Sequence, residues 1–298
     1  MREYRTRRLL KLVISLLLLV SSPLYASTAD KTVLYFSALT PEGWRIVMTN
    51  PGDKRYRPLP TAVEAREFAY SPRRQALIYI GSDLKLRRLD EARQKESVLY
   101  TPTGRDLLAQ PVYDDERDTV YLVFMPSGKS SEADIVAWKN GEIRPAVAQV
   151  SSQFEPFLHK PHWLYYGHVH CTTACGGIIQ EIWVKNLVSG EARQVTLLGK
   201  ISRQPFVSPD GAWLYFSSNK DGHYHIWRQA LPNGRAERVT SGNNADSDPV
   251  VTSDGILYFI RRSGGQSRLM RLDPRGRLET IELPAAFQDL RNLRLYQP

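Results

Sequence analysis

The chain has 298 residues, of which 42% are apolar, so it can bury a substantial core as one large domain or two small ones. Its 40 basic and 31 acidic residues give a net charge of +9, but the basic residues form no long tract, which argues against nucleic-acid binding. The two cysteines are an even number, which agrees with a bridge formed in an oxidising compartment.

The first 26 residues have the organisation of an export signal. Four arginines lie within residues 1–8, residues 12–20 are almost wholly apolar, and a short segment follows that ends in the small residue Ala26. An apolar run of nine residues is about half of the roughly 20 that a membrane-spanning helix requires. We predict cleavage after Ala26, with Ala29 and a retained anchor as alternatives, and a mature protein without stable membrane insertion. Residues 1–26 hold five basic residues and one acidic residue, so the mature net charge is +5.

A repeat organises residues 27–298, which we predict to form a single domain. Six short apolar runs centred on a tyrosine recur at intervals of 42 to 50 residues. They occupy residues 33–36, 77–80, 120–123, 163–166, 213–216 and 256–259. This period is typical of the four-stranded blades of β-propellers.

Each tyrosine run lies among further predicted strands. In four repeats a proline opens a short apolar strand nine or ten residues earlier, and a tight turn such as 208–211 separates that strand from the tyrosine run. Third strands are predicted at residues 44–48, 84–87, 134–138, 181–184, 225–228 and 268–271. A polar fourth strand follows, for example at 192–196. Short strands without helical periodicity predict an all-β fold, a six-bladed β-propeller.

The two ends of the chain predict how the ring closes. The first repeat begins directly at its tyrosine run and lacks a first strand, whereas residues 288–295, beyond the last repeat, alternate between apolar and polar. We predict that this C-terminal segment completes blade one as its first strand. Closure of this kind hides sheet edges that would otherwise promote aggregation.

The fifth repeat, residues 204–227, resembles the WD40-like repeat of TolB-type propellers, because strand, turn and following strand match in order. The other repeats match in outline. The resemblance implies a periplasmic propeller that presents a protein-binding surface. TolB carries an α/β domain before its propeller, for which residues 27–298 leave no room, so the resemblance is to the propeller domain alone. We therefore expect a protein of the cell envelope as partner, without specifying its identity.

Two enlarged loops indicate which face binds that partner. From the central tyrosine to the aliphatic residue of the third strand the chain advances 11 residues in blades one, five and six, but 14 in blade three and 17 in blade four. Such loops all emerge on one face of a propeller, and enlarged loops on a rigid scaffold often carry binding. The predicted contact residues are Ser127, Lys129, Glu132, His168, His170, Thr172 and Thr173.

The blade-four loop also gathers two histidines and two cysteines. Cys171 and Cys175 are predicted to form a disulfide, with His168 and His170 as solvent-facing neighbours. The alternative is a zinc or copper site made of these four side chains.

His159 and His162, near the first turn of blade four, are a second metal candidate. Some propeller polysaccharide lyases, which also resemble TolB-type repeats, hold a metal with histidines near the central axis.

The sequence shows no sign of hydrolytic chemistry. Residues 114–116 are interpreted as a solvated turn, and the chain has no Gly-x-Ser-x-Gly motif. We predict a non-catalytic protein without a cofactor. The alternative is a metal-dependent polysaccharide lyase or a propeller that binds an anionic glycan.

Overall fold

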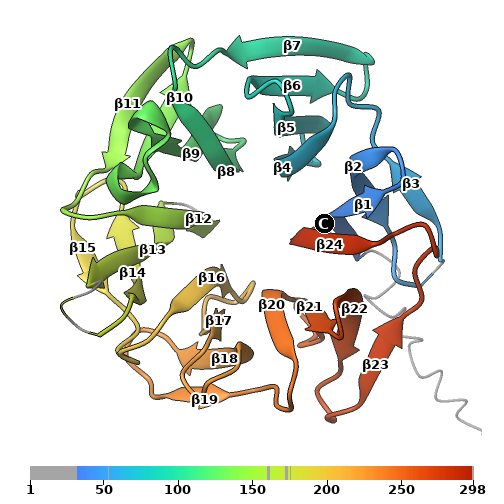
Figure 1. Ribbon diagram of the computed structural model, residues 1–298, viewed down its shortest axis with the longest axis vertical. Helices are drawn as coiled ribbons and strands as arrows, with labels where there is room; N and C mark the ends of the chain where they lie inside the picture. Colours follow the sequence, from blue (N-terminus) through green and yellow to red (C-terminus); the bar gives the residue numbers. More distant parts are fainter. Residues whose placement is uncertain (1–31, 53, 160–161, 172–173, 175, 297–298) are drawn as a thin grey trace, which may run out of the picture.

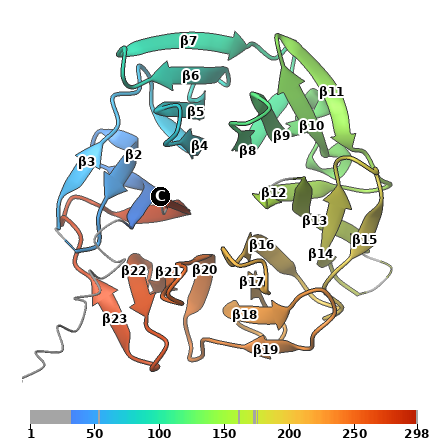
Figure 2. The ribbon, with the colours of Figure 1, turned by 180° about the vertical axis from the view of Figure 1, so that it is seen from behind.

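The computed structural model describes residues 32–296, except 53, 160–161, 172–173 and 175. In this part of the chain, six four-stranded antiparallel sheets are arranged as blades of a ring (Figure 1). Figure 2 shows the same ring from behind. In each blade the strand next to the axis is strand A and the outermost is strand D. The predicted six-bladed β-propeller is confirmed.

Blades one to three use the N-terminal part of the described chain and its last strand. From strand A to strand D, blade one consists of β24 (Asp289–Tyr296), β1 (Val33–Thr40), β2 (Gly43–Thr49) and β3 (Tyr56–Pro58). Blade two consists of β4 (Ala65–Ser71), β5 (Ala76–Gly81), β6 (Leu86–Asp90) and β7 (Lys95–Tyr100). Blade three consists of β8 (Leu107–Asp114), β9 (Thr119–Met125), β10 (Asp134–Lys139) and β11 (Glu142–Val147).

The remaining blades follow in chain order. Blade four consists of β12 (Gln153–His159), β13 (Trp163–Cys171), β14 (Ile179–Asn186) and β15 (Ala192–Gln194). Blade five consists of β16 (Ser202–Val207), β17 (Trp213–Ser218), β18 (His225–Ala230) and β19 (Ala236–Arg238). Blade six consists of β20 (Ala245–Val251), β21 (Leu257–Ser263), β22 (Gln266–Leu272) and β23 (Leu278–Ile281). Nowhere in the described ranges does a helix have the length and apolar character of a membrane span.

The C-terminal strand closes the ring, as predicted. β24 pairs antiparallel with β1, from Val33 opposite Tyr296 to Leu39 opposite Asp289. In Figure 1 the last strand, in red, lies beside the first, in blue. Because β24 supplies strand A of blade one, it presents one face to blade six and carries two fully buried leucines, Leu290 and Leu293. The two ends of the described chain are therefore held in one sheet.

The hydrophobic core lies between the blades. Each of the six interfaces between neighbouring blades contains one cluster of buried apolar side chains. The tyrosines of strand B all belong to these clusters, and none is more than 8% exposed. They are Tyr35, Tyr79, Tyr121, Tyr165, Tyr215 and Tyr258. The tyrosine repeat in the sequence thus reports core packing.

The connections divide the ring into two faces. Connections between strands B and C, and from strand D to the next strand A, lie at one end of each blade, which we call the B–C face. In blade four the amide of Gln180 at the start of β14 donates to Lys200 O in the link to blade five, at 3.2 Å. The turns between A and B and between C and D lie at the opposite A–B face. There Leu187 N donates to His162 O at 2.9 Å.

The prolines predicted to open strand A lie inside that strand instead. β8, β12, β16 and β20 begin three or four residues before their prolines. The residues that precede them have φ of 51° to 56°, and the pairing register shifts there. They are Gln110, Glu155, Gln204 and Asp248. Since proline cannot donate to the ladder, a β-bulge is where a strand tolerates it.

Two smaller predictions are also wrong. The third strand of blade two begins at Leu86, not Leu84, because Leu84 closes a tight turn with φ of 64° and donates its amide to Gly81 O at 2.9 Å. Asp114 ends β8 where the turn begins and is not solvated, since it is 0% exposed. Its Oδ2 accepts from Nη1 of Arg117 at 2.8 Å, and its Oδ1 accepts the amides of residues 116 and 117. The turn therefore needs this carboxylate as a buried cap.

Candidate binding surfaces

The enlarged loop of blade three is an exposed ridge on the B–C face. Between β9 and β10 the chain forms two short 3₁₀ helices, η2 (Pro126–Gly128) and η3 (Ser130–Glu132). The predicted contact residues Ser127, Lys129 and Glu132 are all exposed. Lys129 Nζ lies 2.9 Å from Glu132 Oε1, with both side chains more than half exposed, at 59% and 53%. Such a pair contributes at most about 1 kcal/mol to folding, so both charges are available to a partner.

The blade-four loop differs from its predicted description at one histidine. His170 is exposed as expected, but His168 is only 7% exposed. Strand β12 pairs with β13 at this point, where Gln153 lies opposite His168. The imidazole ring of His168 lies 5.2 Å from the ring of Trp183. Burial lowers the pKa of His168, and the charge of His170 lowers it further. His168 is therefore part of the packing beneath the loop.

The cysteine chemistry of this loop stays a prediction. Thr172, Thr173 and Cys175 lie outside the described residues. The disulfide between Cys171 and Cys175, the four-ligand metal site and the contacts of the two threonines are therefore all untested. Across the described ranges no three His, Cys, Asp or Glu side chains are placed to hold a metal ion.

The second histidine pair is split between two environments. His159 ends β12 and lines a funnel at the axis on the A–B face. Burial lowers its pKa, and the carboxylate of Asp210 opposes that shift. The ring of His162 instead lies 5.1 Å from the ring of Trp163. Within the described part of the chain, neither histidine belongs to a group that could bind a metal.

Three exposed apolar side chains lie in connections at the B–C face of blade four, and sequence reasoning missed them. Val150 in the link from blade three is 94% exposed, Ile178 before β14 is 55% exposed, and Leu197 in the link to blade five is 80% exposed. Glu181 holds the second link in place by accepting the amides of residues 198 and 199 at 2.5 and 2.6 Å. Because contiguous exposed apolar surface marks interaction sites, three such residues in the connections at one end of one blade make that end a candidate.

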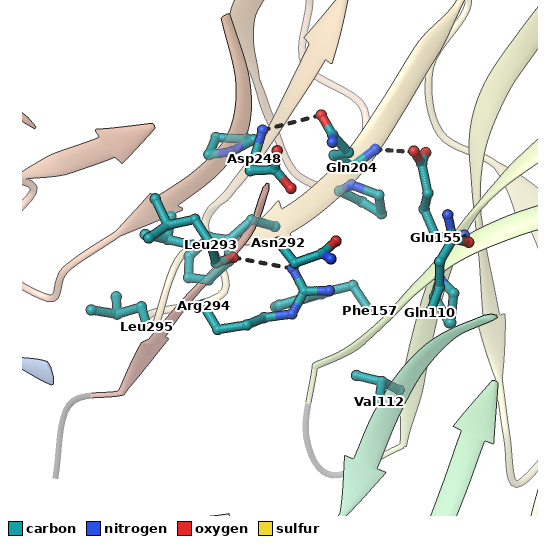
Figure 3. A pocket seen from close by; sticks show the side chains of 15 residues that line it. Gln110, Val112, Glu155, Phe157, Gln204, Asp248, Asn292, Leu293, Arg294 and Leu295 are labelled. Carbon is teal, nitrogen blue, oxygen red and sulfur yellow. Dashed lines mark hydrogen bonds between the residues drawn. The ribbon is translucent and has the colours of Figure 1, made fainter. Parts of the chain in front are cut away.

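A chain of four hydrogen bonds beside the central axis links the strands A of blades two to six. A bulge leaves a backbone amide without a ladder partner, and in this ring a side chain of the preceding blade accepts it. Glu67 accepts from Gln110 N at 2.6 Å, and Gln110 accepts from Glu155 N at 2.7 Å. Glu155 accepts from Gln204 N at 2.9 Å, and Gln204 accepts from Asp248 N at 3.1 Å (Figure 3). The sequence signal was the polar residue directly before each strand-A proline.

Beside this chain of hydrogen bonds lies an axial cavity of about 140 Å³. It adjoins a funnel of about 560 Å³ whose lining includes residues of the A–B turns. Arg294 of β24 lines both spaces.

The wall of the funnel is rich in aromatic rings, which belong to Tyr35, Tyr70, Tyr113, Phe157, Phe206 and Tyr296. The rings of Tyr35 and Tyr70 stack 4.4 Å apart, and burial raises the pKa of Tyr35 to about 12. Tyr35 is therefore a neutral ring surface at physiological pH.

A closed ring of six four-stranded blades, with loops at both faces and a cavity on its axis, defines the six-bladed β-propellers. The chain belongs to the TolB beta propeller domain family, whose model matches residues 141–289. That range runs from the end of blade three to the start of the closing strand. The resemblance noted in the fifth repeat is thereby confirmed.

Individual relatives are distant. An uncharacterized protein of Agrobacterium fabrum is 31% identical over 90 residues, which are 29% of this chain and 31% of that protein. TolB from Acinetobacter baumannii superposes with a TM-score of 0.68 at 13% identity, covering 89% of this chain and 67% of that one.

The fold also occurs within enzymes. Hydrazine synthase of Kuenenia stuttgartiensis gives a TM-score of 0.73 at 11% identity, covering 89% of this chain and 46% of that one. A puromycin-hydrolyzing peptidase of Mycobacterium tuberculosis gives 0.60 at 18% identity, covering 87% and 48%. At these identities the likeness shows the fold alone.

Proposed function

We propose that this chain is a periplasmic, non-catalytic propeller that binds a protein of the cell envelope through its B–C face, at blades three and four. The observation that carries the proposal is the group of exposed apolar side chains Val150, Ile178 and Leu197 at that end of blade four. Membership of the TolB beta propeller domain family supports a protein-interaction role. The basic and apolar segment ahead of Ala26 supports export.

The composition of this face suits a protein partner. Burying a large aliphatic side chain in an interface gains roughly 1.5 to 3 kcal/mol, so three of them supply a substantial hydrophobic centre. Lys129 and Glu132 on the neighbouring ridge, together with the exposed His170, provide polar groups at its edge. An apolar centre with a polar rim is the usual anatomy of a protein interface.

The same blade provides a matched control for an experiment. Val188 is 75% exposed, like the three residues of the proposed interface, but it lies in the C–D turn on the A–B face. We expect Ile178→Asp and Leu197→Asp to abolish recovery of the partner when the purified protein captures it from an envelope extract. Val188→Asp should leave recovery unchanged. Equal losses in all three variants, or none, would contradict the assignment of the binding face.

A further inference from the structure

Arg294 departs from the pattern of the other blades. It lies opposite the strand-B tyrosine of blade one, Tyr35. At the same register position the other five blades place an apolar residue in strand A. These are Phe68, Val112, Phe157, Phe206 and Val250. The fold therefore does not require a charged side chain at this position.

The guanidinium of Arg294 lies at the axial cavity with most of its donors unused (Figure 3). It donates from Nη1 to Leu293 O at 3.1 Å, and it forms no ion pair with a carboxylate among the described residues. A guanidinium has five N–H donors, so four remain for another acceptor. Burial lowers the pKa of Arg294, while the charges of Asp248, Glu67 and Glu155 oppose that shift. Arg294 is partly buried, and because a guanidinium is not deprotonated in proteins, it lies beside the cavity as a cation.

The charge of Glu155 is also unexplained by the fold. Its Oε2 accepts from Gln204 N at the neighbouring bulge and, at 3.3 Å, from Nε2 of Gln180. Gln110 and Gln204 accept the corresponding bulge amides with a neutral carboxamide. Burial raises the pKa of Glu155, which means that its charged form is unfavourable where it lies. Asp248, only 8% exposed, adds a second carboxylate to the lining of the same cavity.

We propose that the axial cavity binds a free α-amino acid with an apolar side chain. Its carboxylate would accept from Arg294, its ammonium group would donate to Glu155 and Asp248, and its side chain would extend into the aromatic funnel. A simple anion would face the two carboxylates, and a metal cation would face the guanidinium, whereas a zwitterion meets both with the opposite charge. A cavity of about 150 Å³ holds a benzene-sized ligand, so this one has room for the head group.

This site is independent of the proposed protein interface, because the funnel lies toward the A–B face. Isothermal titration of the full protein with L-leucine and L-phenylalanine tests it. N-acetyl-L-leucine lacks the ammonium group and L-leucinamide lacks the carboxylate, so each loses the charge-assisted hydrogen bonds of one end. Each should therefore bind at least about tenfold more weakly than L-leucine. No binding of either amino acid, or equal binding of the blocked derivatives, would overturn the proposal. Tighter binding of a leucyl dipeptide than of leucine would overturn the assignment to a free amino acid.

Two variants test the assigned contacts without disturbing the fold. Arg294→Met places an apolar side chain at the strand-A position where the other five blades have an apolar residue. Glu155→Gln keeps a side-chain oxygen that can accept from Gln204 N. Arg294→Met should bind leucine and leucinamide equally, and Glu155→Gln should narrow the difference between leucine and its N-acetyl derivative. Arg144→Gln, at a side chain that is 79% exposed on β11, is the matched control and should bind as the wild type does. Thermal unfolding checks that each variant is folded, and wild-type selectivity in folded Arg294→Met would refute the site.

Discussion

Replacing Leu293 by alanine tests the closure of the ring. Leu293 is 1% exposed in β24 and packs in the cluster between blades six and one, together with Leu290 at 2%. Truncating a fully buried leucine costs about 2 to 5 kcal/mol, because the transfer free energy is lost and a cavity remains. A typical domain is stable by only about 5 to 15 kcal/mol. We therefore expect Leu293→Ala to lower the free energy of unfolding by about 3 kcal/mol.

Urea unfolding followed by tryptophan fluorescence and circular dichroism measures this difference. Leu278→Ala is the matched control, because Leu278 is 44% exposed on the outermost strand of blade six. A surface substitution of that kind changes stability by less than about 0.5 kcal/mol. Equal midpoints for Leu293→Ala and the control would refute the packing of β24 against blade six. The double variant with Leu290→Ala should lose less than the sum of the two effects, since both side chains lie in one cluster.

Three further predictions concern polar groups that are buried or partly buried in the ring. Because burial raises the pKa of Glu155 in the folded protein, the stability of the wild type relative to Glu155→Gln should fall as pH rises above about 4.3, which pH-dependent thermal unfolding measures. Burial lowers the pKa values of His159, His168 and His225, so the free energy of unfolding should fall as pH drops below about 6.5. Urea titrations at several pH values measure this fall, and the His225→Gln variant should show a smaller one. Gln204→Leu should cost about 1 to 3 kcal/mol in urea unfolding, because it leaves Asp248 N unpaired, and an unchanged midpoint would contradict that bond.

The ring and its closure could be predicted from the sequence because they rest on local patterns. The buried tyrosines of strand B recur once per blade, and the alternating residues 288–295 matched the missing first strand. The bulges could not be predicted, since a proline near a strand reads equally well as its first residue or as an interruption within it. Only the pairing register distinguishes the two, and register depends on the neighbouring strand.

The candidate surfaces were predictable only in part. Loop length drew attention to Lys129 and Glu132, and the structure finds them exposed. Burial of single residues was beyond sequence reasoning: His168 is covered by β12, whereas Val150 and Leu197 lie in water despite their apolar side chains. Arg294 shows no local signal either, because its significance comes from comparison with residues of five other blades that meet only at the axis.

Site-specific photo-crosslinking in living bacteria tests the central claim most directly. A photoreactive residue at position 178 probes the B–C face of blade four, and one at position 188 probes the A–B face of the same blade. Both native side chains are exposed and apolar, so the two positions differ chiefly in the face they report. We predict one discrete adduct with an envelope protein from position 178 and none from position 188. The same adducts from both positions, or an adduct from position 188 alone, would contradict binding through the B–C face.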